Sequence, residues 1–206
     1  MSELTAFVRV EHDPDVDDPY DDETWEFISF DRRMKQFKDP DTLGVQPMRN
    51  GDGVITDKAL KRKYEAGSLF WLDCYRHSGE AWSLHGGGMQ CQWDTAPNAG
   101  LLIMKATRSN WWRKLTYEQR CHQASKMLEV FNDWNNGNCY WYQTLLSDDT
   151  GEDSCGGWIG DDVFVGLQEW WDGLAVKPTL VECRGDAAFM AETWAHRLKG
   201  VQVRKS

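Results

Sequence analysis

Side chains that can act as acids, bases and nucleophiles gather beside glycines and tryptophans in three short stretches. The stretches are Tyr-Arg-His-Ser-Gly at 75–79, Cys-Gln-Trp-Asp at 91–94 and Asp-Ser-Cys-Gly at 153–156. Each falls where an expected strand meets a turn, and folds usually place their working groups there. A cysteine nucleophile needs a base that lowers its pKa and a third group that orients the base. The stretches therefore suggest a catalytic hypothesis, with Cys155 as nucleophile, His77 as base and Asp94 or Asp153 as the orienting carboxylate.

The same residues also have a structural interpretation. Cysteine is among the most buried residue types, so Cys155 can be a small packing residue where a hairpin closes, with His77 as an ordinary turn residue. Ser78 and Asp153 can satisfy backbone donors, as serine and aspartate often do in turns. The chain has no G-x-S-x-G elbow or other catalytic signature specific to a family. We therefore favour a binding function and keep catalysis as the alternative.

Metal and phosphate sites are not indicated by the spacing of the ligand types. His77 and His85 are eight residues apart, outside the short spacings typical of zinc sites. Aspartates at 13, 15 and 17 match the first ligands of a calcium-binding EF-hand loop, but the glycine and the glutamate that the loop requires later are absent. The glycine run at 86–88 has neither P-loop nor Rossmann spacing. We expect no metal and no cofactor.

Negative charge is concentrated at the start of the chain. The 206 residues carry a net charge of −10, and residues 1–31 alone hold eleven acids against one base. This balance argues against binding to nucleic acid or to an anionic membrane, because a phosphate backbone requires a basic footprint. An exposed acidic loop over 13–23 would instead suit a basic partner protein, or would mimic nucleic acid. Its candidate binding residues are Asp13, Asp15, Asp17 and Asp18.

Tryptophan is unusually abundant, with twelve residues. Most are expected in the core, because each aromatic side chain buries roughly 150–250 Å². An exposed tryptophan can instead anchor a partner, and Trp93 is the candidate for that role. The six cysteines form no C-x-x-C pair, and no apolar run is as long as a membrane span. Because residues 1–10 form a polar, alternating segment, we expect no signal peptide. These features predict a cytosolic protein with reduced thiols.

Hydrophobic periodicity predicts the elements that must position these side chains. The clearest helix is expected over 116–135, where Thr116 and Gln119 fit a capping box. Ser68–Tyr75 is apolar on both faces and is expected to be a central strand. A last helix is expected to begin at Asp186 and to turn Phe189 inward. Other strands are expected near 6–10, 25–30, 81–84, 101–105, 139–147, 153–159 and 179–183, with short helices near 57–64 and 162–171.

The order of these elements predicts the fold class. Strands are interspersed with helices without a regular βαβ alternation, which is typical of an α+β fold. We expect a mixed or antiparallel sheet packed against one long and two or three shorter helices. Residues 1–171 are predicted to form a single domain. Residues 172–206 are predicted to form a strand–helix appendage packed on the same domain.

Several short motifs resemble those of a family of small, uncharacterised bacteriophage and prophage proteins. The motifs are Phe-Val-Arg-Val-Glu-His-Asp at 7–13, Tyr-x-His-Ser-Gly at 75–79, Cys-x-Trp-Asp at 91–94, Gly-Leu-Leu-Ile at 100–103 and Asp-Ser-Cys at 153–155. With other short matches, the resemblance covers roughly residues 5–170. The chain departs from the family pattern at Arg76, where the family often has an acid, and at Gln92, where it has a proline.

The resemblance implies a phage-encoded accessory protein made in the host bacterial cytoplasm, and it implies no particular activity. With the charge and the tryptophans, it leads to the hypothesis of a protein that binds and inhibits a host or anti-phage defence protein. One alternative is a thiol- or histidine-dependent hydrolase of a small metabolite. Another is a protein that sequesters a nucleotide signal as its small-molecule ligand. We expect no contact with membranes and no direct binding to nucleic acid.

Overall fold

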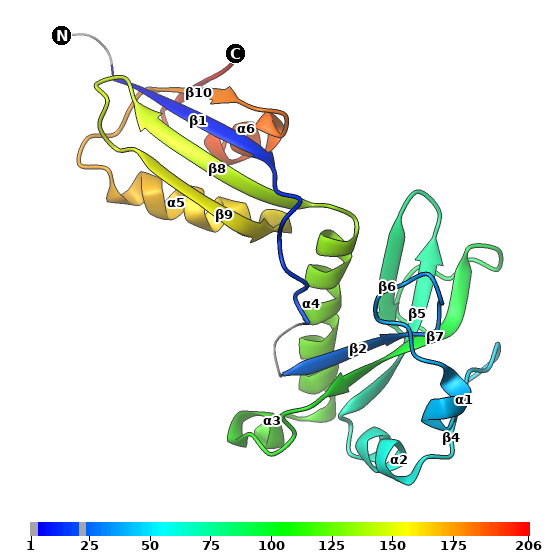
Figure 1. The fold of residues 1–206 in the computed structure, drawn as a ribbon. Coiled ribbons are helices and arrows are strands. Elements are labelled where there is room, and N and C mark those ends of the chain that lie inside the picture. Colours follow the sequence, from blue (N-terminus) through cyan, green and yellow to red (C-terminus); the bar gives the residue numbers. More distant parts are fainter. Residues whose placement is uncertain (1–3, 21–23) are drawn as a thin grey trace. The chain divides into compact units, whose positions relative to one another are not determined.

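A computed structural model describes residues 4–20 and 24–206, and their contacts divide them into two compact units (Figure 1). The terminal unit joins residues 4–17 to residues 137–206, and the central unit contains residues 18–20 and 24–136. The predicted α+β class is confirmed. This division differs from the predicted boundary between residues 171 and 172. The first strand of the chain pairs with strands that follow residue 137, so the two ends of the chain share one unit. Local sequence patterns do not reveal such long-range pairing.

The terminal unit is built on a mixed five-stranded sheet. Its strands lie in the order β11 (Gln202–Lys205), β10 (Leu180–Arg184), β1 (Thr5–His12), β8 (Cys139–Leu146) and β9 (Asp153–Ile159). Strand β1 runs parallel to β10 and antiparallel to β8, and β8 and β9 form the predicted hairpin. The side chains of β1 alternate, so that Ala6, Val8 and Val10 are fully buried on one face.

Two helices cover this buried face. They are α5 (Val163–Gly173), which follows a short 3-10 turn at Gly160–Asp162, and α6 (Ala188–Ala195). Their apolar residues share one core with β1, β8 and β10. The prediction that Phe189 faces inward is wrong, since its side chain is half exposed while Trp194 fills the core. Asp186 does not cap α6 as expected, because its carboxylate accepts a hydrogen bond from the His12 backbone N–H.

The central unit is built on an antiparallel four-stranded sheet. Its strands lie in the order β2 (Trp25–Ser29), β7 (Thr95–Met104), β5 (Leu69–Arg76) and β6 (Glu80–Leu84). Strand β5 is central, as its two apolar faces predict. Both faces are covered, because Phe70 and Leu72 belong to one apolar cluster and Leu69 and Trp71 to another.

Different segments provide the two covers of this sheet. The long helix α4 (Tyr117–Asn135) packs on one face, together with Trp112 of the short helix α3 (Asn110–Lys114). Residues 40–65 fold over the other face as small elements that contribute Leu43, Val45, Ile55 and Leu60. These elements are α1 (Pro40–Leu43), β3 (Val45–Gln46), β4 (Val54–Ile55) and α2 (Lys58–Glu65).

The predicted long helix begins as its sequence indicates. The Thr116 hydroxyl accepts a hydrogen bond from the Gln119 backbone N–H, and the Gln119 side chain accepts one from the Thr116 backbone N–H. This capping box satisfies donors that a helix start leaves unpaired. Seven of the twelve tryptophans are buried, which confirms their expected role in the core.

Candidate functional site

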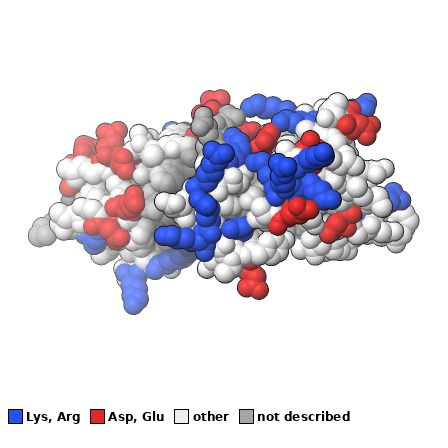
Figure 2. Space-filling view, turned by 90° about the horizontal axis from the view of Figure 1, so that it is seen from below, with Lys and Arg blue, Asp and Glu red and all other residues white. Residues whose placement is uncertain are grey.

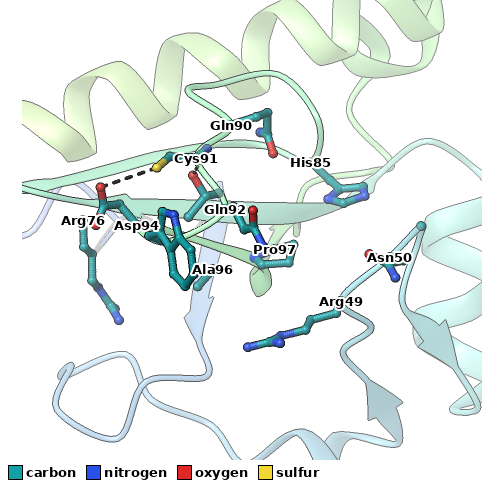
Figure 3. Close-up of a pocket in the computed structure, with 13 residues that line it drawn as sticks. Arg49, Asn50, Arg76, His85, Gln90, Cys91, Gln92, Asp94, Ala96 and Pro97 are labelled. Atoms are coloured by element: carbon teal, nitrogen blue, oxygen red, sulfur yellow. Dashed lines mark hydrogen bonds between the residues drawn. The ribbon is translucent and has the colours of Figure 1, made fainter.

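An open pocket of about 1060 Å³ lies in the central unit, beside strands β5, β6 and β7 (Figure 3). Four segments line it: the loop that follows β3, the end of β5, the turn after β6, and the chain that leads into β7 and along its start. Figure 3 shows Arg49 and Arg76 reaching into the open space, with His85 at another part of its wall. The lining includes the side chains of Arg49, Arg76, His85, Cys91, Trp93 and Asp94.

A local irregularity of the sheet creates one wall of this pocket. The pairing of β5 with β7 shifts between Leu72 and Cys74, where β7 contains extra residues. Asn98 lies in this bulge with a φ of 51°, a left-handed conformation that asparagine tolerates better than most residues. The Asn98 side chain donates hydrogen bonds to the carbonyls of Met48 and Gly51, at 2.7 and 3.0 Å. The bulge therefore fixes the loop that carries Arg49.

Asp73 is the buried centre of the same irregularity. Its side chain is 1% exposed, and it accepts hydrogen bonds from the backbone N–H groups of Gly86 (2.8 Å) and Asn98 (2.9 Å), and from the Gln90 amide (3.2 Å). The His85 Nδ1 lies 2.7 Å from the Asp73 Oδ1, the oxygen that also accepts from Asn98. Burial raises the pKa of this carboxyl, but the hydrogen bonds outweigh burial and lower it. Asp73 is therefore an anion that organises the pocket wall.

This carboxylate fixes the orientation of His85. An ionised carboxylate only accepts hydrogen bonds, so Nδ1 carries the proton in the bond to Asp73. When the imidazole is neutral, Nε2 is the ring nitrogen that keeps its lone pair, and it lies 3.9 Å from a carboxylate oxygen of the exposed Asp52. A carboxylate that orients an imidazole in this way is the arrangement that general-base catalysis uses. His85 can therefore act as a base or as a hydrogen-bond acceptor toward a ligand.

Asp94 connects two of the residue types that the sequence singled out. Its Oδ2 accepts a hydrogen bond from the Cys91 thiol at 3.5 Å (dashed in Figure 3) and lies 3.6 Å from the His77 Nδ1. The structure thus brings the predicted pair of His77 and Asp94 together, in a loose geometry with the His77 side chain 71% exposed.

The predicted nucleophile lies elsewhere. Cys155 is an exposed residue of β9 in the terminal unit, and its thiol lies 3.7 Å from the Gly156 carbonyl oxygen. His77 and Asp94 belong to the central unit, so neither unit by itself contains the predicted triad. Asp153, the alternative orienting group, accepts a hydrogen bond from the Tyr142 hydroxyl at 3.1 Å. Burial and this carboxylate raise the Tyr142 pKa.

The acidic loop is partly structural. Asp18 is buried, and its carboxylate accepts hydrogen bonds from the Tyr20 backbone N–H and the Gln36 amide. The prediction that Asp18 is exposed is therefore wrong, because its carboxylate satisfies donors inside the fold. Asp13 accepts bonds from the backbone N–H groups of residues 15 and 157, while Asp15 and Asp17 are exposed. Residues 21–23 of the predicted loop lie outside the described residues.

Two other predicted binding residues lie on the surface of the central unit. Ser78 is exposed in the turn between β5 and β6. Trp93 lines the pocket and is 85% exposed, so its large ring does not pack in the core. Its role as an anchor for a partner stays a prediction.

Sequence reasoning missed Asp73 and His85 as a functional pair. The available signal is the single carboxylate of Asp73 inside an otherwise apolar strand, Leu69–Tyr75. A buried charge needs a partner, so this residue marks a site even before the fold is known.

No group of three or more His, Cys, Asp or Glu residues in the described ranges is placed to hold a metal ion. Among the helices that the structure describes, none combines the length and the apolar character needed to cross a membrane. Comparisons with protein-family models, curated proteins and solved structures find no match. The resemblance to phage proteins therefore rests on the short motifs alone.

Proposed function

We propose that this protein binds a small anionic ligand with a planar ring, of the nucleotide type, in the pocket of the central unit. The observation that carries the proposal is Trp93, which is 85% exposed beside a pocket into which Arg49 and Arg76 reach (Figure 3). An exposed indole offers a face for stacking, and guanidinium groups hold phosphate or carboxylate oxygens by paired hydrogen bonds.

The two arginines have different surroundings, which suggests different tasks. Arg76 is held by Asp31 at 2.7 Å and Glu80 at 2.8 Å, and its side chain remains 30% exposed. It is therefore a fixed donor whose charge is largely balanced. Arg49 is exposed on a loop that Asn98 fixes. Arg49 would supply the positive charge for the anionic group, and His85 would accept a hydrogen bond from the ligand.

In the cell, the protein would act by holding the ligand. Following the resemblance to phage proteins, we place it in the host bacterial cytoplasm, where it would remove a nucleotide signal from a host or anti-phage defence protein. For the acidic loop, we propose that Asp15 and Asp17 bind such a host or defence protein directly. Neutralising these two exposed carboxylates together would then weaken capture of the protein and leave ligand binding unchanged.

The test is titration calorimetry with a panel of linear and cyclic nucleotides. Trp93→Ala and Arg49→Ala should each weaken binding by about tenfold or more, because each removes one anchor. Phe189→Ala and Lys199→Ala remove an exposed ring and an exposed cation from the terminal unit and should bind as wild type. Absence of binding to every nucleotide, or equal affinity in all four variants, would contradict the proposal.

A second candidate function is hydrolysis of the bound ligand. The hydrogen bond of 2.7 Å between Asp73 and His85 favours it, because it prepares an imidazole to activate a water molecule. Product formation would be followed by chromatography after incubation with each nucleotide that binds. His85→Gln should abolish turnover and retain binding. If the ligand binds but is recovered intact after prolonged incubation, hydrolysis is excluded and only the sequestering function is left.

A further inference from the structure

Positive charge gathers on one part of the surface of the central unit. Segments 58–63 and 105–120 hold nine lysines and arginines and a single acid, Glu118. Figure 2 shows blue side chains gathered on the face seen from below, over the region of α2 and α3 in Figure 1. The net charge of the whole chain conceals this surface, because sixteen acids and seven bases fall in residues 1–17 and 137–206.

Packing around Ser68 joins the two segments into one surface. The Trp112 indole N–H donates a hydrogen bond to the Ser68 hydroxyl at 3.0 Å. Arg120 donates to the Ala66 carbonyl at 2.6 Å, and Lys63 donates to the Met104 carbonyl at 3.4 Å. These contacts tie the end of α2 to the end of β7 and to the start of α4. The basic patch, as we call it, comprises the exposed side chains of Lys58, Lys61, Arg62, Lys105, Arg108, Arg113 and Lys114.

Aromatic rings are interleaved with these cations. Trp112 is buried beneath the patch, and the adjacent Trp111 is 46% exposed, with the two rings edge to face at 5.5 Å. Tyr117 at the start of α4 is 62% exposed, and its ring lies against Gly67. Trp111 therefore packs against a buried indole while part of its own ring stays open to solvent. Arg120 lies over the other indole, with its guanidinium carbon 5.4 Å from the Trp112 ring.

We propose that the basic patch binds a single strand of nucleic acid. The exposed lysines and arginines would contact phosphates, and Trp111 and Tyr117 would stack on unpaired bases. Cations that follow a backbone and aromatic rings that receive bases are the two parts of a sequence-tolerant single-strand site. An acidic protein partner would explain the cations but not the exposed aromatic rings among them. This inference is independent of the pocket and replaces the expectation, drawn from net charge, that the chain does not bind nucleic acid.

The test is fluorescence anisotropy with a labelled oligonucleotide of about 15 deoxythymidines, a length that covers the usual single-strand site sizes. Arg113→Glu with Lys114→Glu should weaken binding more than tenfold. The same double variant should reduce the salt slope, since a single strand contributes about 0.7 to that slope for each phosphate contact. Trp111→Ala should weaken binding about tenfold and leave the salt slope unchanged, because stacking releases no counterions.

Matched controls lie in the terminal unit. Lys199→Glu with Arg204→Glu makes the same change in net charge at two exposed positions, and Phe189→Ala removes an exposed ring. Both should bind the oligonucleotide as wild type. If charge reversal unfolds the protein, as judged by circular dichroism, Arg113→Gln with Lys114→Gln replaces it and should still weaken binding.

Three kinds of result would overturn the proposal. The first is no binding of the oligonucleotide at low salt, or equal loss in patch and control variants. The second is equal affinity for a duplex of the same length with no effect of Trp111→Ala, which would show contact with phosphates alone. The third is tighter binding to phosphatidylserine vesicles than to the oligonucleotide, which would make an anionic membrane the partner.

Discussion

Asp73 shows how one buried carboxylate determines both a local structure and a candidate site. Its hydrogen bonds hold the turn after β6, the bulge of β7 and the ring of His85 in one arrangement. Hydrogen bonds to a charged group contribute about 1.5–3 kcal/mol each, and a donor left without its partner costs about 1–3 kcal/mol. The same interactions give the site its geometry and the central unit part of its stability.

We predict that Asp73→Asn lowers the free energy of unfolding at pH 7 by about 2–4 kcal/mol. The folded-state pKa of Asp73 is lowered, so its contribution is present above the unfolded pKa of about 3.9 and is lost as the pH falls through the folded pKa. Urea unfolding at several pH values should therefore show the two proteins converging below about pH 4. Glu65→Gln neutralises an exposed acid and should change stability by less than about 0.5 kcal/mol. A constant difference between wild type and Asp73→Asn across this range would contradict the prediction.

The cysteines should differ in reactivity according to burial. Burial raises the pKa of Cys74 and of Cys183 to about 12, which keeps both thiols protonated at neutral pH, whereas Cys155 is exposed. We predict that iodoacetamide labels Cys155 first and labels Cys74 and Cys183 only when the protein unfolds. Peptide mass spectrometry with and without urea measures this order. Labelling of Cys74 at the rate of Cys155 in the folded protein would rule out the described packing.

At the scale of elements, the start of α4 offers a test of local sequence control. Loss of the Thr116 hydroxyl leaves the Gln119 backbone N–H without its acceptor. Thr116→Ala should therefore lower the unfolding free energy by about 1 kcal/mol. Thr116→Ser keeps the hydroxyl and should recover most of that loss in thermal and urea unfolding. Equal destabilisation by alanine and serine would show that the cap contributes nothing and that the methyl group matters instead.

The elements also show which features a single sequence can predict. The capping box and the two apolar faces of β5 are encoded within a few neighbouring residues, and both were predictable. The pocket depends on Asn98 reaching back to the loop of Met48–Gly51, and on Asp73 meeting His85 across a bulge. No local periodicity encodes such contacts. Cys155 was grouped with His77 by residue type alone, and the chain places them in different units.

At the scale of the whole molecule, the central unit is an insertion between two paired strands. The register of β1 and β8 pairs His12 with Tyr140, and the Asp13 backbone N–H donates to the Cys139 carbonyl at 2.8 Å. Without residues 18–136, these strands would be the arms of an ordinary hairpin. Loop tips of this kind are where chains tolerate inserted domains. The central unit has apolar clusters on both faces of its own sheet, so its core does not depend on shared strands.

We therefore predict that residues 18–136, produced alone, fold with a single cooperative transition in urea, because both faces of their sheet are covered from within the segment. A complementary chain, in which a short Gly-Ser turn joins Asp17 to Gly137, should also unfold cooperatively, because it retains all five strands with α5 and α6. Circular dichroism and urea titration of both chains measure this. The excised central unit should also keep the pocket and the basic patch, and so bind nucleotides and the oligonucleotide as the full chain does. A segment 18–136 that is soluble but lacks a cooperative transition would show that the insertion needs the terminal unit to fold.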